Sequence, residues 1–248
     1  MQNSSSHFSF SLAAIAAGFL LSLSPASSAV LVNYTFPSGS NASTASDPNV
    51  AVSLITSNIG IVGTDSGFSS SSSNAFARAN ATASSEVDAV EGADYFQFTL
   101  TPQGGYEVDL TSFSMQFGNQ SSSSFNFASS FFVRTSLDNF GSNVAISPTG
   151  TTLTFNQGVA TRTTTSSSYG SGTVAFDVSG TYQNLASAVT LRIYIFDNSD
   201  SGTLVTRFDN VVINGNVSPI PEPSAAGLTA LGSLLALALR RSRKRSVS

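Results

Sequence analysis

Apolar residues recur at every second position in short runs along the middle of this chain. Residues 96–100 alternate phenylalanine and leucine with polar residues, and residues 113–117 alternate phenylalanine and methionine in the same way. Successive side chains of a strand point to opposite faces, so each run would bury one face and expose the other. The pattern therefore predicts roughly eight or more strands. Besides these two runs, they include residues 30–36, 125–133, 174–178, 189–195 and 204–213.

Turn-forming residues separate these runs at residues 102–105, 138–141, 147–150 and 197–202. Many short strands joined by turns rich in Gly, Pro, Asn and Asp indicate an all-β domain built as an antiparallel β-sandwich. Within that class we expect a jelly roll.

Three intervening segments carry weaker signals. The serine-rich residues 69–73 and 121–124 are predicted to be loops. Residues 74–85 are rich in alanine, but their Ser and Thr content favours a strand or loop over a short helix. Ser129 and Ser130 predict a bend within the strand expected over residues 125–133.

The first 29 residues have the features of a secretion signal. Residues 8–23 are apolar and small, and residues 24–29 read Ser-Pro-Ala-Ser-Ser-Ala, which suits a signal peptidase site. We predict cleavage after Ala29. Residues 1–7 lack Lys and Arg, so an uncleaved anchor or a buried helix is the alternative. The predicted β-sandwich then spans residues 30–218.

The inventory of side chains in this middle region excludes several chemistries. It contains neither Cys nor His nor Lys, which removes disulfides, Ser-His-Asp and Cys-His catalysis, Ser-Lys dyads and the usual zinc sites. Five arginines stand against thirteen acids, a net charge of −8. Because such a surface repels phosphates, nucleic acid is not an expected partner.

The chain ends in a proline-rich linker, an apolar segment and a basic cluster. Pro221, Glu222 and Pro223 begin a tail in which residues 224–239 are apolar. A helix over those residues would be roughly 24 Å long, slightly shorter than a bilayer core of about 30 Å. The basic residues that follow would stay cytoplasmic under the positive-inside rule and leave the middle domain outside; they are Arg240, Arg241, Arg243, Lys244 and Arg245.

This order of motif, helix and arginines resembles the PEP-CTERM sorting signal, with residues 219–248 as the tail, 224–239 as its transmembrane helix and 240–245 as its basic cluster. The resemblance implies recognition in the inner membrane by an exosortase, which cleaves near the Pro-Glu-Pro motif and delivers the protein to the envelope or exopolysaccharide matrix. A plain tail anchor that is never processed is the alternative. Residues 94–100, 133–140 and 208–215 are also similar to uncharacterised β-sandwich domains found ahead of such tails, and no activity comes with that likeness.

Oxygen ligands could hold calcium at strand ends, as they do in many oxygen-rich loops. Residues 197–202 begin like an EF-hand loop, but Phe208 occupies the place of its bidentate glutamate. Asp197, Asp200 and Asp209 are therefore weak candidates for a structural calcium ion, and a hairpin turn explains the segment without one.

Two further groups are candidates for carbohydrate chemistry. The acids Glu86, Asp88, Glu91 and Asp94 form the densest acidic group, which we interpret as a solvated loop rather than a catalytic pair. Sugar-stacking rings could come from tyrosines, namely Tyr95, Tyr106, Tyr169, Tyr182 and Tyr194.

The sequence thus predicts a non-enzymatic protein, exported and transiently anchored in the membrane, that resides in the cell envelope or extracellular matrix. A carbohydrate-binding module of the exopolysaccharide matrix is the first alternative. An acid-pair glycoside hydrolase or lyase is the second.

Overall fold

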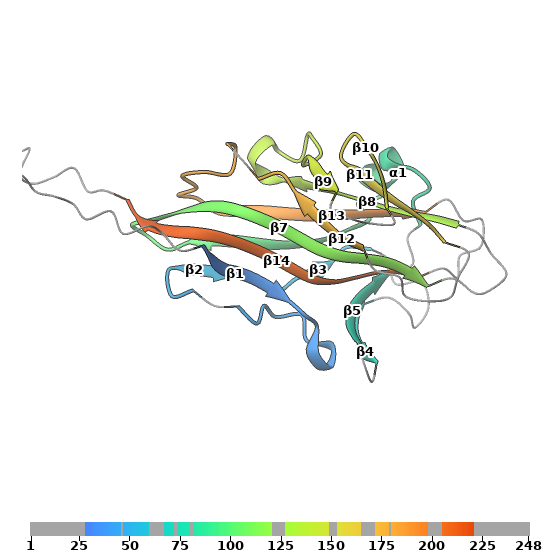
Figure 1. Ribbon diagram of the computed structural model, residues 1–248, viewed down its shortest axis with the longest axis horizontal. Coiled ribbons are helices and arrows are strands. Elements are labelled where there is room, and N and C mark those ends of the chain that lie inside the picture. Colours follow the sequence, from blue (N-terminus) through green and yellow to red (C-terminus); the bar gives the residue numbers. More distant parts are fainter. Residues whose placement is uncertain are drawn as a thin grey trace, which may run out of the picture.

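Strands dominate the structure and form two antiparallel sheets (Figure 1). The computed structural model describes residues 28–45, 47–59, 67–71, 74–79, 82–120, 127–148, 153–164, 172–178, 180–197 and 205–220. The predicted signal helix and the predicted helix over residues 224–239 lie outside these ranges. Within them, no helix is long and apolar enough to cross a membrane.

Each sheet has seven strands. The first sheet has the order β4 (Gly67–Ser71), β5 (Asn74–Ala79), β14 (Val205–Pro219), β7 (Tyr106–Gln120), β12 (Gly172–Phe176) and β9 (Ile146–Pro148), with β1 (Ala29–Tyr34) also beside β14. The second sheet has the order β10 (Thr154–Asn156), β11 (Val159–Thr164), β8 (Phe127–Thr135), β13 (Val189–Asp197), β6 (Tyr95–Pro102) and β2 (Val50–Val52), with β3 (Thr56–Ser57) also beside β6. The short helices are η1 (Pro37–Gly39), α1 (Glu86–Glu91) and η2 (Ser136–Asp138).

A single large apolar core lies between the two sheets. Aromatic rings cross from one sheet to the other: Phe208 of β14 meets Phe96 of β6 edge to face at 4.8 Å between ring centroids. Phe117 of β7 and Phe131 of β8 are 4.2 Å apart. These contacts make a sandwich-like arrangement, so the predicted all-β antiparallel fold is confirmed at this level.

The predicted period-two runs lie in strands as expected. In β6, Phe96, Phe98 and Leu100 are buried while the residues between them are only partly buried. Because β7 pairs with β14 over 15 residues of each strand, this pair forms the longest ladder of the first sheet. Alternation in the sequence therefore located the central strands correctly.

A β-bulge interrupts the alternation in β14. The register with β7 shifts between Asp209 and Val212, and Asn210 has a left-handed φ of 49°. The extra residue changes which side chains face inward, so that Phe208 and then Val211 and Ile213 all lie in the core. Phe208 and Val211, although three positions apart in the sequence, therefore lie on the same buried face of β14.

Four local predictions were wrong. Ser69–Ser71 belong to strand β4 rather than to a loop, and Ser147 and Pro148 lie in the edge strand β9 rather than in a turn. Proline is tolerated on an edge because its missing N–H faces away from the ladder. Strand β8 runs through Ser129 and Ser130 without a register shift against β13, so the predicted bend is absent.

The fourth wrong prediction is the solvated loop over residues 86–94. Residues Glu86–Glu91 form α1, whose N-cap Ser85 accepts a hydrogen bond from the backbone N–H of Asp88. The helix packs Ala89 against Phe132 and Tyr194 on the outer face of the second sheet. An ordered helix is needed to cover Phe132 and Tyr194, and a solvated loop would leave these rings exposed.

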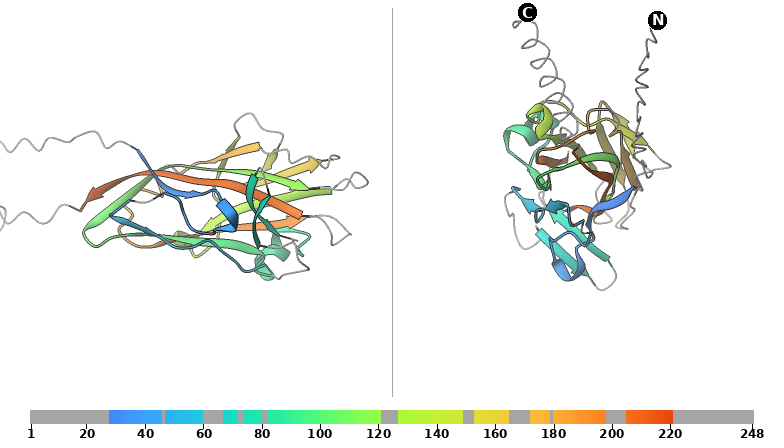
Figure 2. Two further views of the ribbon diagram at one scale, coloured as in Figure 1. Left: turned by 90° about the horizontal axis from the view of Figure 1, so that it is seen from below. Right: turned by 90° about the vertical axis from the view of Figure 1, so that its left-hand side faces the viewer.

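Both ends of the described domain lie at the same end of the sandwich. Ala29 at the start of β1 pairs with Gly215 near the end of β14, and the backbone N–H of Ile220 donates to the carbonyl of Gly105. Figure 2 shows β1 beginning and β14 ending side by side.

Candidate functional site

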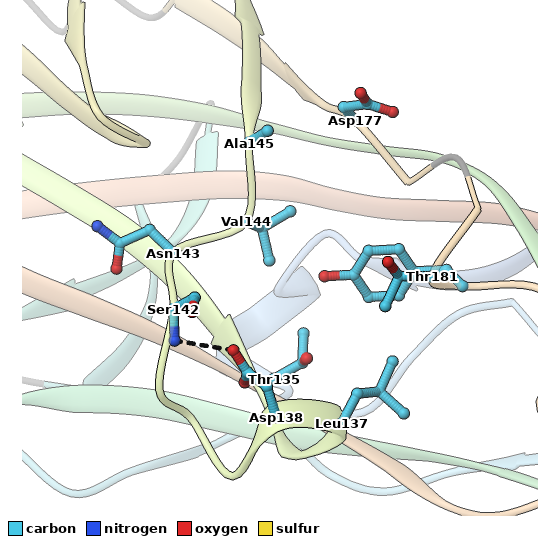
Figure 3. Close-up of a pocket in the computed structure, with 10 residues that line it drawn as sticks. Thr135, Leu137, Asp138, Ser142, Asn143, Val144, Ala145, Asp177 and Thr181 are labelled. Carbon is cyan, nitrogen blue, oxygen red and sulfur yellow. Dashed lines mark hydrogen bonds between the residues drawn. The ribbon is translucent and has the colours of Figure 1, made fainter.

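A pocket of about 320 Å³ opens at one edge of the sandwich (Figure 3). Its walls come from the end of β8, from η2 and the loop that leads to β9, and from the segment that follows β12. The lining residues are Thr135, Leu137, Asp138, Ser142, Asn143, Val144, Ala145, Asp177, Thr181 and Tyr182.

Tyr182 supplies the aromatic ring of this pocket and is buried, with 9% of its surface exposed. Burial raises the pKa of its hydroxyl; a hydrogen bond with Thr135 opposes this shift, and the charges of Asp138 and Asp177 add to it. The hydroxyl therefore stays protonated at physiological pH and serves as a hydrogen-bonding group, not as a base.

Two carboxylates flank the pocket from opposite sides (Figure 3). The Oδ2 of Asp138 accepts the backbone N–H of Ser142 at 2.8 Å, and its Oδ1 accepts that of Gly141 at 3.2 Å, which orders the wall loop. Asp177 is exposed, and its own backbone N–H donates to the carbonyl of Ala145 at 2.8 Å. The pocket thus offers acceptors and a phenol to a ligand that carries hydroxyl groups.

A second polar cluster lies on the outer face of the second sheet. We call it the arginine–aromatic face; its members are Tyr95, Gln97, Phe132, Arg134, Phe140, Arg192 and Tyr194. Cross-strand register places Arg192 directly opposite Arg134 on one side and Gln97 on the other. The adjacent row consists of Phe132, Tyr194 and Tyr95, so aromatic rings lie beside the guanidinium groups.

Arg134 is fully engaged in this cluster. It donates from Nη2 to the Oε1 of Glu86 at 2.9 Å, from Nε to the Oδ1 of Asn143 at 2.8 Å and from Nη1 to the carbonyl of Phe140 at 3.1 Å. Its guanidinium carbon also lies 5.1 Å from the ring centroid of Phe132. The ion pair with Glu86 neutralises its charge locally.

Arg192 has a different environment. Its guanidinium carbon lies 4.3 Å from the ring centroid of Tyr95 and 3.8 Å from that of Phe140. Its Nε donates to the Oε1 of Gln97 at 3.2 Å, and its Nη1 lies 3.5 Å from the hydroxyl of Tyr194. The groups that contact its guanidinium directly are therefore neutral.

Two of the predicted calcium ligands, Asp197 and Asp209, lie in different sheets. Asp197 lies buried at the end of β13 in the second sheet, where its backbone N–H donates to the carbonyl of Ala83, whereas Asp209 lies in β14 of the first sheet. Asp200 lies outside the described residues. Among the residues that the structure describes, no group of three or more acids or other metal-binding side chains is suitably placed for an ion.

The predicted acidic group serves structure. Glu86 pairs with Arg134, and hydrogen bonds from Ser84 and Ser85 lower the pKa of Asp88. Asp94 is buried and accepts three hydrogen bonds on one oxygen. Glu91 is exposed. Three of the four acids thus have structural partners within the domain.

The candidate tyrosines do not form exposed stacking platforms. Tyr182 and Tyr194 are buried, and Tyr95 and Tyr106 are half-buried. Tyr169 lies outside the described residues. Pro221, Glu222, Pro223 and the basic residues 240–245 also lie outside them, and the predicted cleavage after Ala29 stays a prediction.

Four charged residues that define the two clusters were not predicted as site residues from the sequence. Asp138 lies 39 positions from Asp177, and Arg134 lies 58 positions from Arg192, so only the tertiary structure brings each pair together. One available signal was the segment Leu-Arg-Ile-Tyr at residues 191–194, which places an arginine and a tyrosine in a strand whose other face is apolar.

The burial of the Asp209 carboxyl in β14 predicts a pH-dependent stability. Burial raises the pKa of its carboxyl to about 6, partly opposed by a hydrogen bond from the backbone N–H of Asn210. Because the folded pKa exceeds the unfolded value, stability is greatest when the group is protonated and falls as the pH rises from about 4 to 6. Asp209→Asn should therefore raise the free energy of unfolding by about 1–2 kcal/mol at pH 7 and by almost nothing at pH 4.

Urea denaturation of both proteins between pH 4 and pH 7 measures this difference. Other titrating groups are common to the two proteins and cancel in the comparison. An equal difference in stability at every pH would contradict the burial of an ionisable carboxyl at this position.

No known protein family, curated protein or solved structure matches this chain.

Proposed function

We propose that this chain is an exported, non-enzymatic protein of the cell envelope or extracellular matrix, sorted through a PEP-CTERM tail and processed by an exosortase. The observation that supports the proposal is the extent of the folded domain: its described strands begin at Ala29, where the predicted signal peptide ends, and end at Pro219, where the predicted tail begins. Since both ends leave the same end of the sandwich, two flanking segments could enter one membrane while the domain points away from it.

We also propose that the sandwich is a jelly roll. Eight strands support this, taken in chain order as β1, β6, β7, β8, β11, β12, β13 and β14. The first, eighth, third and sixth of these are neighbours in one sheet, and the second, seventh, fourth and fifth are neighbours in the other. That order is the one produced by two interleaved Greek keys.

Mass spectrometry of the protein recovered from envelope and medium tests the sorting proposal. We expect a mature N-terminus at Val30 and a C-terminus near Pro221–Pro223. Replacing Pro221, Glu222 and Pro223 together with alanine should leave the tail attached and retain the protein in the membrane fraction. Pro219→Ala, two residues upstream at the end of β14, is the matched control and should be processed normally.

An identical C-terminus and distribution for the triple variant and the unaltered protein would overturn sorting through this motif. An intact tail on all molecules would instead support the plain anchor.

The pocket favours one alternative, a carbohydrate-binding module. Its two carboxylates and the Tyr182 phenol suit the hydroxyl groups of a sugar. A glycan array with the full chain tests it; Asp177→Asn should abolish any signal that arises in the pocket. If the full chain instead releases new reducing ends from a polysaccharide, and Asp177→Asn does not, the hydrolase alternative would replace the non-enzymatic proposal.

A further inference from the structure

Two aromatic rings and two hydrogen-bond partners contact the guanidinium of Arg192. Tyr95 and Phe140 lie within 4.3 Å and 3.8 Å of its central carbon, and the Gln97 amide oxygen accepts from its Nε at 3.2 Å. Aromatic contacts of this kind attract the cation while restricting its rotation. The side chain has therefore already lost much of the freedom that it would otherwise lose on binding a ligand.

No acidic residue occupies the described cross-strand positions beside Arg192. The directly opposite residues are Arg134 and Gln97, and the preceding and following rows contain only aromatic or hydroxyl side chains: Phe132, Tyr194, Tyr95, Thr190 and Thr99. Glu86 neutralises only Arg134, so the net local charge of the pair Arg134 and Arg192 is positive. Like charges directly opposite each other also destabilise a sheet. An anion beside Arg192 would remove this imbalance.

A carboxylate matches the geometry of this site. The planar fork of an arginine binds a carboxylate through two parallel hydrogen bonds. In Arg192, Nε is occupied by Gln97 and Nη1 lies at the limit of hydrogen bonding to Tyr194, so the edge that carries Nη1 and Nη2 is the one that can receive a ligand. The half-buried position lowers the effective dielectric constant and strengthens such a contact.

The surroundings favour a sugar acid over a simple anion. Thr99 and Thr190 join their hydroxyls at 2.8 Å in the row next to Arg192, and Thr56 extends the polar surface at the edge of the sheet. Thr99 and Thr190 are half-buried and Thr56 is exposed; with the Gln97 amide, these groups offer donors and acceptors to ring hydroxyls on this face. The acidity of the rest of the domain acts weakly here, because charges beyond about 8 Å are screened at physiological salt.

We propose that Arg192 anchors a second ligand site, on the arginine–aromatic face, which binds the carboxylate of a uronic acid in an acidic polysaccharide. The site is centred on Arg192, which does not line the pocket, although the loop of residues 138–143 contributes to both, and it does not depend on sorting by the tail.

Calorimetric titration of the full chain in mild detergent with trigalacturonate tests this proposal. Arg192→Lys keeps the charge but loses the fork and should weaken binding at least tenfold, and Arg192→Gln should abolish it. Phe140→Leu should weaken binding several-fold because the guanidinium loses one of the two rings that contact it. Arg207→Lys makes the same change on a strand of the first sheet and should leave the affinity unaltered.

The chemistry of the ligand is varied in the same assay. Carboxyl-reduced trigalacturonate should not bind, and citrate should bind at least tenfold more weakly than trigalacturonate. No binding of trigalacturonate, or equal affinity for the Arg192 variants, would overturn the site. Equal affinity for citrate would overturn its assignment to a sugar acid. Circular dichroism melts of every variant confirm that the fold is kept.

Discussion

Replacing Phe208 with alanine is expected to lower the free energy of unfolding by about 3–5 kcal/mol. This ring is fully buried in β14, and it contacts Phe96 of the opposite sheet edge to face at 4.8 Å and Phe36 at 5.8 Å. Its removal would leave a cavity where the two sheets meet, which the rigid strands can close only in part.

Chemical denaturation of the full chain, monitored by far-ultraviolet circular dichroism, measures the loss. Phe208→Leu keeps most of the volume and should cost clearly less than alanine. Leu54→Ala is the surface control: Leu54 is 54% exposed, so its change should stay within about 0.5 kcal/mol. A cost below 1 kcal/mol for Phe208→Ala would show that the sheets do not pack through this ring.

Replacing Asp94 with alanine is expected to cost about 2–4 kcal/mol. The side chain is buried, and its Oδ2 accepts from the backbone N–H and the hydroxyl of Thr82 at 3.1 and 2.8 Å and from the backbone N–H of Ala83 at 2.9 Å. Without the carboxylate these donors lose their partner in a place that water reaches poorly.

The same denaturation experiment compares Asp94→Ala with two controls. Asp94→Asn keeps one acceptor oxygen and should lie between alanine and the unaltered protein. Glu91→Ala removes an exposed acid from the neighbouring helix α1 and should have an effect within about 0.5 kcal/mol. Equal effects for Asp94→Ala and Glu91→Ala would contradict the hydrogen-bonded role of Asp94.

Local signals predicted the central strands well because the residues of a half-buried strand alternate between apolar and polar along the sequence. In β6 and β13 every second residue is buried, and both strands were predicted from that alternation. The sequences of the edge strands were less informative, because β4 and β9 contain serines and a proline, which are typical of loops. These segments are strands because each pairs with a neighbouring strand.

Helix α1 shows why composition misled at one position. Its acids suggested a solvated loop, yet they are compatible with a first helical turn, where Glu86 and Asp88 favour the positive end of the helix dipole. The buried Ala89 then supplies the contact with Phe132 and Tyr194 that stabilises so short a helix. That contact joins residues more than 40 positions apart.

By itself, the sequence determined an all-β antiparallel fold, since the alternation of apolar residues is a local property. Tertiary structure alone decided which charges meet. Arg192 lies opposite Arg134 and beneath Phe140 because β13 pairs with β8, and Asp138 shares a pocket with Asp177 because η2 and the end of β12 meet at one edge. Such neighbours depend on the order of strands in the sheets, which arises from packing the whole core and leaves no periodic trace along the chain.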